Sequence, residues 1–412
     1  MGQGRRYRGW ALVWTLGITT IVSYGTTQYL FAVLVVPMQR ELGWSRALLS
    51  GAFSVALLVS GLLGLPIGRL VDRHGARVPM TAGSLLGAAG LGAAALVREP
   101  WQLYAVWSGA IALSMALTLY PVTFTVITNW FTRRRGSALA LLTLLGGLAS
   151  PVFIPLAGVL VERLGWRATL VVLALVQLAV AAPAHALVVR RRPEDLGLLP
   201  DGEPRGAAPP AAAGARVRDA VGGLPFWTLT LAFAMGLLAH SVILTHQVAY
   251  LIGRGFDPVI AAAVAGLLGV ASLPGRYVLN RVSERVGPQS LLAGCYVAQS
   301  AGVGLLAWAA SPLLVWAYVA IYGAAFGAIS PLRASTMADQ FGRRSYGAIT
   351  AVAGVPAAVA AAIGPIAAGA IYDRLGTYGP ALALTSGVFV VSAVAVAVTP
   401  RPGGGGKTAP YS

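Results

Sequence analysis

The feature that most constrains this chain is a series of apolar stretches, each long enough to cross a lipid bilayer. About 20 mostly apolar residues in helical conformation span the roughly 30 Å hydrocarbon layer. Such stretches fold as helices, because backbone polar groups inside lipid must be satisfied within the segment. The sequence predicts twelve of them, near residues 10–36, 48–68, 78–97, 102–128, 137–161, 168–189, 226–251, 258–279, 289–310, 314–338, 347–371 and 379–399.

The scarcity of charge argues against a water-soluble fold. Only 10% of the 412 residues are charged, whereas a soluble domain carries about a quarter. We therefore expect an all-α membrane protein that crosses the bilayer many times. The lone cysteine and the four histidines offer no disulfide framework and no metal-ligand spacing. Nucleotide-binding loops and catalytic triad orders are also missing from the sequence, so no enzyme activity, metal or cofactor is expected.

The distribution of positive charge predicts the orientation of the spans. Most of the 30 Lys and Arg residues fall in loops on the side of both termini, and cytoplasmic loops are the ones enriched in these residues. Both termini are therefore expected in the cytoplasm, in a bacterial inner membrane. The net charge of +17 lies in short loops between apolar stretches, so the expected partner is the lipid bilayer and not a nucleic acid. A monomer is expected.

The chain also contains an internal repeat. Residues 68–77 align with 280–289, residues 131–134 with 341–344, and residues 158–165 with 369–376, at a nearly constant separation. The repeat predicts two pseudo-symmetric six-helix bundles, 1–190 and 225–400, with a central binding site at their interface. Residues 191–224, rich in Ala, Pro and Gly, are expected to form a cytoplasmic linker. Residues 401–412 are expected to be a disordered tail.

The repeated loops carry charges that could hold one conformation. A carboxylate at a helix end accepts bonds from N-terminal amides and pairs with nearby arginines. The alternative is that the arginines enforce topology and bind lipid headgroups. The residues of this predicted conformational latch are Gly68, Asp72, Arg73, Gly75, Arg77, Glu284, Arg285, Arg133, Arg134, Asp339 and Arg343.

Residues 68–77, which read Gly-Arg-Leu-Val-Asp-Arg-His-Gly-Ala-Arg, resemble the signature between spans two and three of the major facilitator superfamily. Residues 8–10, 41–46 and 130–140 are similar to motifs of its monocarboxylate transporter and oxalate:formate antiporter branch. This resemblance implies transport of small carboxylates such as lactate or pyruvate, often with a proton, or exchange of organic anions. It also implies that an arginine in span eight holds the carboxylate, and Arg276 stands at that place.

Arg276 is the leading candidate for binding substrate. An arginine inside a span is costly unless it is paired or wet, and its guanidinium fits a carboxylate bidentately. The alternative is that the side chain extends to the lipid headgroups without a ligand. A second arginine inside a span, Arg333, is expected to have a structural or gating role.

Four further residues complete the predicted substrate site. His246 is a titratable group in an apolar span and resembles a histidine of bacterial relatives, so it could carry a proton. It could equally be a neutral histidine that is hydrogen-bonded between helices. Tyr120 could face Arg276 from span four, and Tyr24 and Gln28 lie about one turn apart in span one.

The positions of the remaining charges narrow the substrate class. No Asp or Glu falls in the middle of a span, so the usual carboxylate proton relay is missing. Ser272 and Gln28 replace an aspartate and a lysine that some relatives carry, which puts the relatives' proton coupling in doubt. Span eleven lacks the lysine that oxalate exchangers pair with their arginine, which favours a monoanion over a dianion.

The sequence thus predicts a secondary carrier that moves a small organic monoanion by alternating access, with or without a proton. A drug or metabolite efflux carrier on the same scaffold is the alternative within transport. A receptor that does not transport is the alternative from another class.

Overall fold

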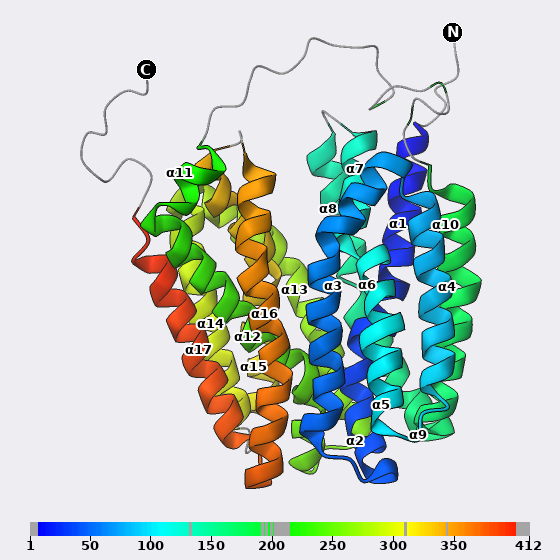
Figure 1. The fold of residues 1–412 in the computed structure, drawn as a ribbon. Coiled ribbons are helices and arrows are strands. Elements are labelled where there is room, and N and C mark those ends of the chain that lie inside the picture. Colours follow the sequence, from blue (N-terminus) through cyan, green and yellow to red (C-terminus); the bar gives the residue numbers. More distant parts are fainter. Residues whose placement is uncertain are drawn as a thin grey trace, which may run out of the picture. The chain divides into compact units, whose positions relative to one another are not determined.

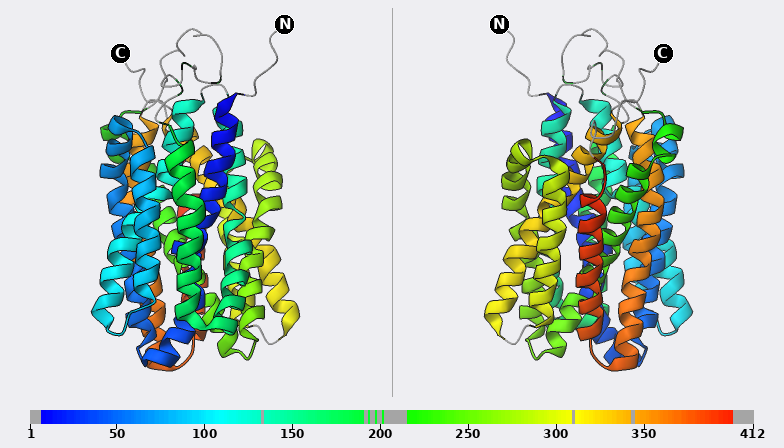
Figure 2. Two further views of the ribbon diagram at one scale, coloured as in Figure 1. Left: turned by 90° about the vertical axis from the view of Figure 1, so that its right-hand side faces the viewer. Right: turned by 90° about the vertical axis from the view of Figure 1, so that its left-hand side faces the viewer.

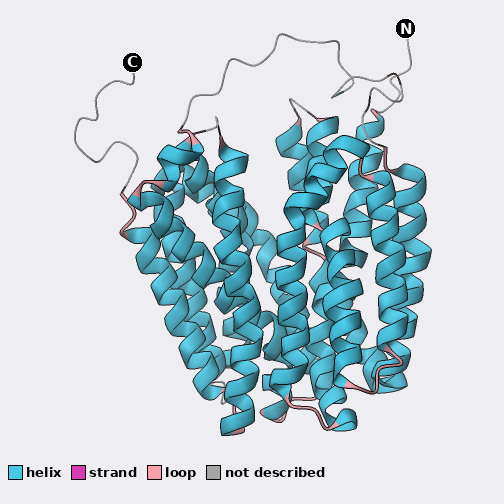
Figure 3. Ribbon diagram, viewed as in Figure 1, coloured by secondary structure: helices cyan, strands magenta, loops and turns pink. Residues whose placement is uncertain are grey.

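The computed structural model describes residues 7–131, 134–190, 193, 197, 201, 215–308, 311–342 and 345–400. Within these ranges every regular element is a helix (Figures 1 and 3). The α-helices are α1 (Arg8–Tyr24), α2 (Leu30–Leu42), α3 (Arg46–His74), α4 (Arg77–Ala94), α5 (Pro100–Leu103), α6 (Ala112–Thr118), α7 (Tyr120–Trp130), α8 (Arg135–Gly146), α9 (Ala149–Val176), α10 (Ala182–Val188), α11 (Val217–Val221), α12 (Leu224–Gly253), α13 (Pro258–Val286), α14 (Pro288–Ala307), α15 (Pro312–Phe341), α16 (Tyr346–Leu375) and α17 (Gly379–Ala397).

The predicted spans all fall on helices of this fold. In the described part of the chain, ten helical stretches are long and apolar enough to cross a membrane. One of them, Ser137–Val188, contains two predicted spans, and non-helical backbone at Gly165 (φ 78°, ψ 164°) divides it. The span predicted at 78–97 corresponds to α4, which begins with Arg77 and is not among the ten. The prediction of an all-α membrane fold is confirmed.

Three π-helical turns interrupt the spans of the first half. They lie at Gly25–Tyr29, Tyr104–Ile111 and Gln177–Ala181. The first and third are joined, since the Thr26 hydroxyl donates to Gln177 Oε1 at 3.2 Å, and both residues are buried. Because π turns widen a helix and often accompany functional sites, the first turn, which follows Tyr24 and contains Gln28, is of particular interest.

The described chain groups into two compact units. Unit 1 contains residues 1–207, 243–270 and 365–376, and unit 2 contains residues 208–242, 271–364 and 377–412. In unit 1, α4 lies beside α6, α9 and α10, and α1 lies beside α8 and α10 (Figures 1 and 2). In unit 2, α14 lies between α15 and α17. This grouping follows spatial proximity, whereas the halves 1–190 and 225–400 follow the repeat and stay a prediction.

The repeat is visible in the backbone at two pairs of glycines. Gly75 and Gly287 both have φ 83°, and both follow the last residue of a helix. Gly165 and Gly376 have φ 78° and 67°. Positive φ is inexpensive only for glycine, which explains why both halves of the repeat retain glycine at these positions.

Candidate functional site

Tyr24 and Tyr120 are the predicted site residues that the structure brings together. Their ring centroids are 4.9 Å apart, and Phe124 stacks on Tyr120 at the same distance. Tyr120 begins α7 directly after an extended residue, Leu119, where the chain breaks from α6. Its hydroxyl lies against Gly146 of α8. Both tyrosines are half-buried, and so is Gln28 in the π turn that follows Tyr24.

His246 lies in α12 and is fully buried in unit 1. Its Nε2 is 2.8 Å from the carbonyl oxygen of Pro365 in α16 and 3.3 Å from the Ser50 hydroxyl in α3. Since a carbonyl oxygen only accepts hydrogen bonds, Nε2 must be protonated, and it donates the hydrogen bond to Pro365. The imidazole therefore joins three helices, as the hydrogen-bonded alternative expects. A role in carrying protons stays a prediction.

A charged cluster next to His246 was missed by the sequence reasoning. Asp373 of α16 accepts hydrogen bonds from the backbone N–H groups of Arg46 (3.0 Å) and Ala47 (2.8 Å), the first residues of α3. The Arg46 guanidinium lies 3.6 Å from the Tyr372 ring centroid, and its Nε donates to Gln39 at 2.7 Å. Arg46 and Asp373 are far apart in the sequence, so only the repeat marker around Asp373 could have drawn attention to them.

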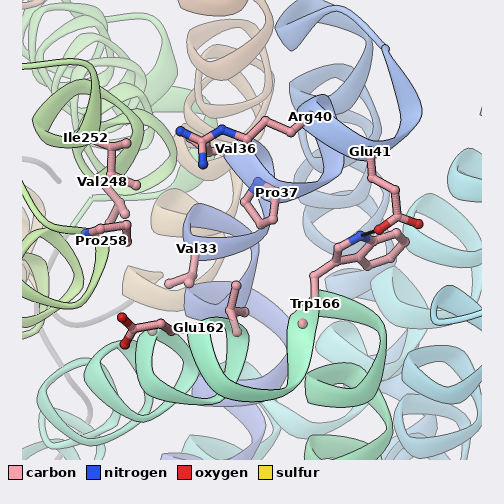
Figure 4. A pocket seen from close by; sticks show the side chains of 13 residues that line it. Val33, Val36, Pro37, Arg40, Glu41, Glu162, Trp166, Val248, Ile252 and Pro258 are labelled. Carbon is pink, nitrogen blue, oxygen red and sulfur yellow. Dashed lines mark hydrogen bonds between the residues drawn. The ribbon is translucent and has the colours of Figure 1, made fainter. Parts of the chain in front are cut away.

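The end of unit 1 at which α2 ends and α3 begins, here called the distal end, also contains a pocket of about 460 Å³ (Figure 4). Val33, Val248 and Pro258 form part of its apolar wall. Glu41 at its rim accepts hydrogen bonds from Trp166 Nε1 at 2.6 Å and from Arg167 at 2.8 Å. None of the five predicted substrate residues lines this pocket.

Arg276 belongs to unit 2, where it lies half-buried in α13. Two glycines bring the backbones of α13 and α15 close together beside it. The position that a Cβ would take at Gly275 is filled by the carbonyl of Ala324, and at Gly327 by the carbonyl of Ser272. This close approach fixes the α13 backbone from which Arg276 extends. That Arg276 and the residues of unit 1 form one site stays a prediction.

The two other histidines within the spans, half-buried His240 and buried His185, form hydrogen bonds. His240 Nδ1 lies 2.9 Å from the Tyr322 hydroxyl, and the imidazole stacks on Phe326 with centroids 4.3 Å apart. His185 Nδ1 lies 2.8 Å from the Ser84 hydroxyl. These contacts link α12 to α15 and α10 to α4.

The structure leaves the predicted latch untested. Arg133 and Arg343 lie outside the described residues, and so do the side chains of Asp72, Arg73 and Glu284. Arg77 donates from Nε to the carbonyl of Ala186 at 2.6 Å, and the Arg134 N–H donates to Asp201 at 3.2 Å. Gly75 closes α3, and Gly68 lies within it; Arg285 and Asp339 are exposed. The latch stays a prediction.

The fold and the apolar spans define a multi-pass integral membrane protein. The model of the Major Facilitator Superfamily matches residues 16–365. The chain belongs to this superfamily, which is a family of membrane transporters.

Relatives in sequence and in structure agree with this membership. The chain is 25% identical to monocarboxylate transporter 13 of Bos taurus over 394 residues, which cover 95% of this chain and 89% of the relative. It is 26% identical to monocarboxylate transporter 13 of Rattus norvegicus, over 95% and 88% of the two chains. A crystal structure of a bacterial homologue of the human lysosomal transporter Spinster superposes with a TM-score of 0.70 at 15% identity, over 96% of each chain. At that identity the structural match establishes the fold.

Proposed function

We propose that this transporter is a secondary carrier for a small organic monoanion, such as lactate or pyruvate, and that Arg276 binds the carboxylate. The observation that carries the proposal is a half-buried arginine in the stretch Pro258–Leu279, which is apolar enough to span the membrane. An arginine at the centre of a span costs about 2.5–3.5 kcal/mol on insertion scales, and Arg276, three residues from the end of this stretch, bears part of that cost. A bound carboxylate offsets that cost through two parallel hydrogen bonds.

Two further observations support the substrate class. The bovine and rat relatives are named as monocarboxylate transporters, and their similarity to this chain extends over 95% of its length. The span Ala348–Leu375 contains no Lys, Arg, Asp or Glu before Asp373. The apolar stretch Pro258–Leu279 contains one cation, Arg276, and the stretch of α16 before Asp373 contains none, which matches one carboxylate better than two.

The same residues leave two routes by which a proton could be transported with the anion. The proton can enter on His246 or on the acid itself, because no carboxylate lies in the middle of a span to carry it. We further propose that both termini face the cytoplasm of a bacterial cell, that Tyr24, Gln28 and Tyr120 contribute to the substrate site, and that the carrier works as a monomer.

Uptake into liposomes tests the proposal. Labelled lactate, pyruvate, acetate and formate are presented to the reconstituted protein with and without an inward proton gradient. We expect Arg276→Ala to lower uptake about 30-fold or more, because losing one member of a desolvated charge pair costs about 2–5 kcal/mol. Arg276→Lys should retain part of the uptake, and Arg218→Ala, at an exposed arginine of α11, should retain all of it.

Two results would count against the proposal. Unchanged uptake of every carboxylate by folded Arg276→Ala protein would remove Arg276 from the site. Export of apolar cations by a protein that takes up no carboxylate would assign the efflux alternative.

A further inference from the structure

A second arginine of unit 2 lines a pocket of its own. The pocket has a volume of about 280 Å³ and is bordered by α12, α15 and α16. Arg333 lies in its wall together with Ser330, Phe233, Tyr346 and Thr350. Such a volume accommodates a small organic acid, and none of the residues proposed above for the substrate site lines it.

The pocket is built from two helical stripes. Ser330, Arg333 and Ala334 of α15 are three and four residues apart, so they share one face of that helix. Tyr346 and Thr350 are four residues apart on α16, and they likewise share a face. Side chains with hydroxyl groups therefore approach the arginine from both helices.

The Arg333 side chain is held against an aromatic ring, but no acidic side chain among the described residues neutralises its charge. Its guanidinium carbon lies 4.4 Å from the centroid of the Phe233 ring, a cation–π contact. Within the described residues it forms no ion pair with an acidic side chain. A half-buried cation inside a span is costly without a counter-charge or water, and the Phe233 ring supplies only part of that compensation.

The polar groups around Arg333 can recognise an anion. The Ser330 hydroxyl forms no hydrogen bond with the described residues and is free to donate. The Tyr346 hydroxyl donates to the carbonyl of Ala334 over a long 3.3 Å, so it can be redirected. Guanidinium and hydroxyl donors, with no acid facing them among the described lining residues, fit a carboxylate.

We propose that this pocket is a second anion subsite, which binds a small carboxylate on Arg333 independently of Arg276. The proposal deepens the proposed function and rests on it for the class of ligand. It assigns Arg333 a role in binding, where the sequence alone suggested a structural or gating role.

Cysteine chemistry at Ser330 tests the subsite without relying on transport. The lone cysteine is first removed by Cys295→Ala, and Ser330→Cys then places a thiol in the pocket. Two methanethiosulfonate reagents of similar size, one anionic and one cationic, are compared on protein that elutes as a folded species. We expect the anionic reagent to react about tenfold faster, because a fixed positive charge concentrates anions locally.

The variants separate the arginine from general access. Arg333→Gln should bring the ratio of the two rates close to one, whereas Arg333→Lys should keep the preference for the anionic reagent. Lactate or formate should slow the modification, and this protection should disappear in Arg333→Gln but persist in Arg276→Gln. Ser335→Cys, an exposed position of α15 outside the pocket, is the matched control and should show no protection.

The outcomes distinguish the subsite from the proposed function. Equal rates for both reagents, with no protection by lactate, formate or inorganic phosphate, would overturn the subsite even if Arg276-dependent uptake is observed. Protection that depends on Arg333, in a protein that takes up no carboxylate, would support an anion subsite and count against the proposed function.

Discussion

Glu162 and Asp373 occupy the same place in the two halves of the repeat, and unit 1 uses them differently. Asp373 accepts hydrogen bonds from the first two N–H groups of α3, at 3.0 and 2.8 Å. Glu162 lines the distal pocket, is exposed, and has no hydrogen bond or ion pair with the described residues (Figure 4). One acid thus ties two helices together, and the other does not.

The helix that each acid could cap explains the difference. The first turn of α13 is capped by its own Asp257, whose Oδ1 accepts from the N–H groups of Val259 and Ile260 at 2.9 and 3.1 Å. In α3 the side chain of Ser45 accepts only from Leu48, at 3.2 Å. Two N–H groups of α3 are therefore left for Asp373, whereas α13 offers Glu162 no comparable group.

What the two halves share is close packing at a glycine. A Cβ at Gly369 would lie 2.9 Å from the Ala47 backbone in α3, and a Cβ at Gly158 would lie 2.7 Å from the Ala262 Cβ in α13. The repeat has thus kept the close approach of the helices while the role of the acid diverged. A sequence repeat is accordingly a better guide to packing than to the function of a charge.

The largest expected effect comes from removing Asp373, the acid that accepts hydrogen bonds from α3. Asp373→Ala should lower the free energy of unfolding by about 2–3 kcal/mol, because two N–H groups in the first turn of α3 lose their hydrogen bonds to a charged acceptor. Glu162→Ala should change it by less than about 0.5 kcal/mol, as an exposed substitution does. Thermal unfolding in detergent measures both, and equal effects would erase the proposed difference between the halves.

Filling the glycine contact should have the next largest effect. Gly369→Ala is expected to destabilise by about 1–3 kcal/mol, since the added methyl meets backbone atoms that cannot turn away. Gly354→Ala in the same helix is the matched control, because its Cβ would meet nothing within 4 Å. A control that unfolds as early as Gly369→Ala would show that glycine in α16 matters for a reason other than this contact.

A variant of Asp257 tests whether this residue alone caps the first turn of α13. Asp257→Ala should cost about 1 kcal/mol, the usual value of an N-cap. Adding Glu162→Ala should cost nothing further if Glu162 takes no part in capping α13. A double variant that is clearly less stable than Asp257→Ala would mean that Glu162 substitutes for the missing cap.

The smallest effect is expected at Arg46. Arg46→Lys keeps the charge but loses the planar group above Tyr372, so we expect a loss of about 0.5–1 kcal/mol. Arg163→Lys, at an exposed arginine, should be neutral in the same unfolding assay. If Arg46→Lys is neutral as well, the stacking contributes nothing measurable to the distal end.

The fold was predictable because its signal is local. Apolar length places each helix, and the glycines at 75, 165, 287 and 376 carry the repeat in both sequence and backbone. The break at Gly165 falls between the spans predicted at 137–161 and 168–189. The π turns were not predicted, because a hydropathy pattern does not distinguish one helical hydrogen-bond register from another.

The site was harder to predict because it depends on contacts between distant segments. The proximity of Tyr24 to Tyr120, and the hydrogen bonds that Asp373 accepts from the start of α3, follow from tertiary packing and not from spacing along the chain. Arg276 and Arg333 were recognisable because an arginine inside an apolar stretch requires an explanation in any fold.

Counterflow tests the central claim most directly, because every carrier that alternates access shows it whatever its coupling. Liposomes that contain the protein are loaded with unlabelled lactate and diluted into a trace of labelled lactate. A monocarboxylate carrier should accumulate label transiently above equilibrium, and Arg276→Ala should not. Folded protein that shows no transient accumulation with lactate, pyruvate, acetate or formate would contradict the account.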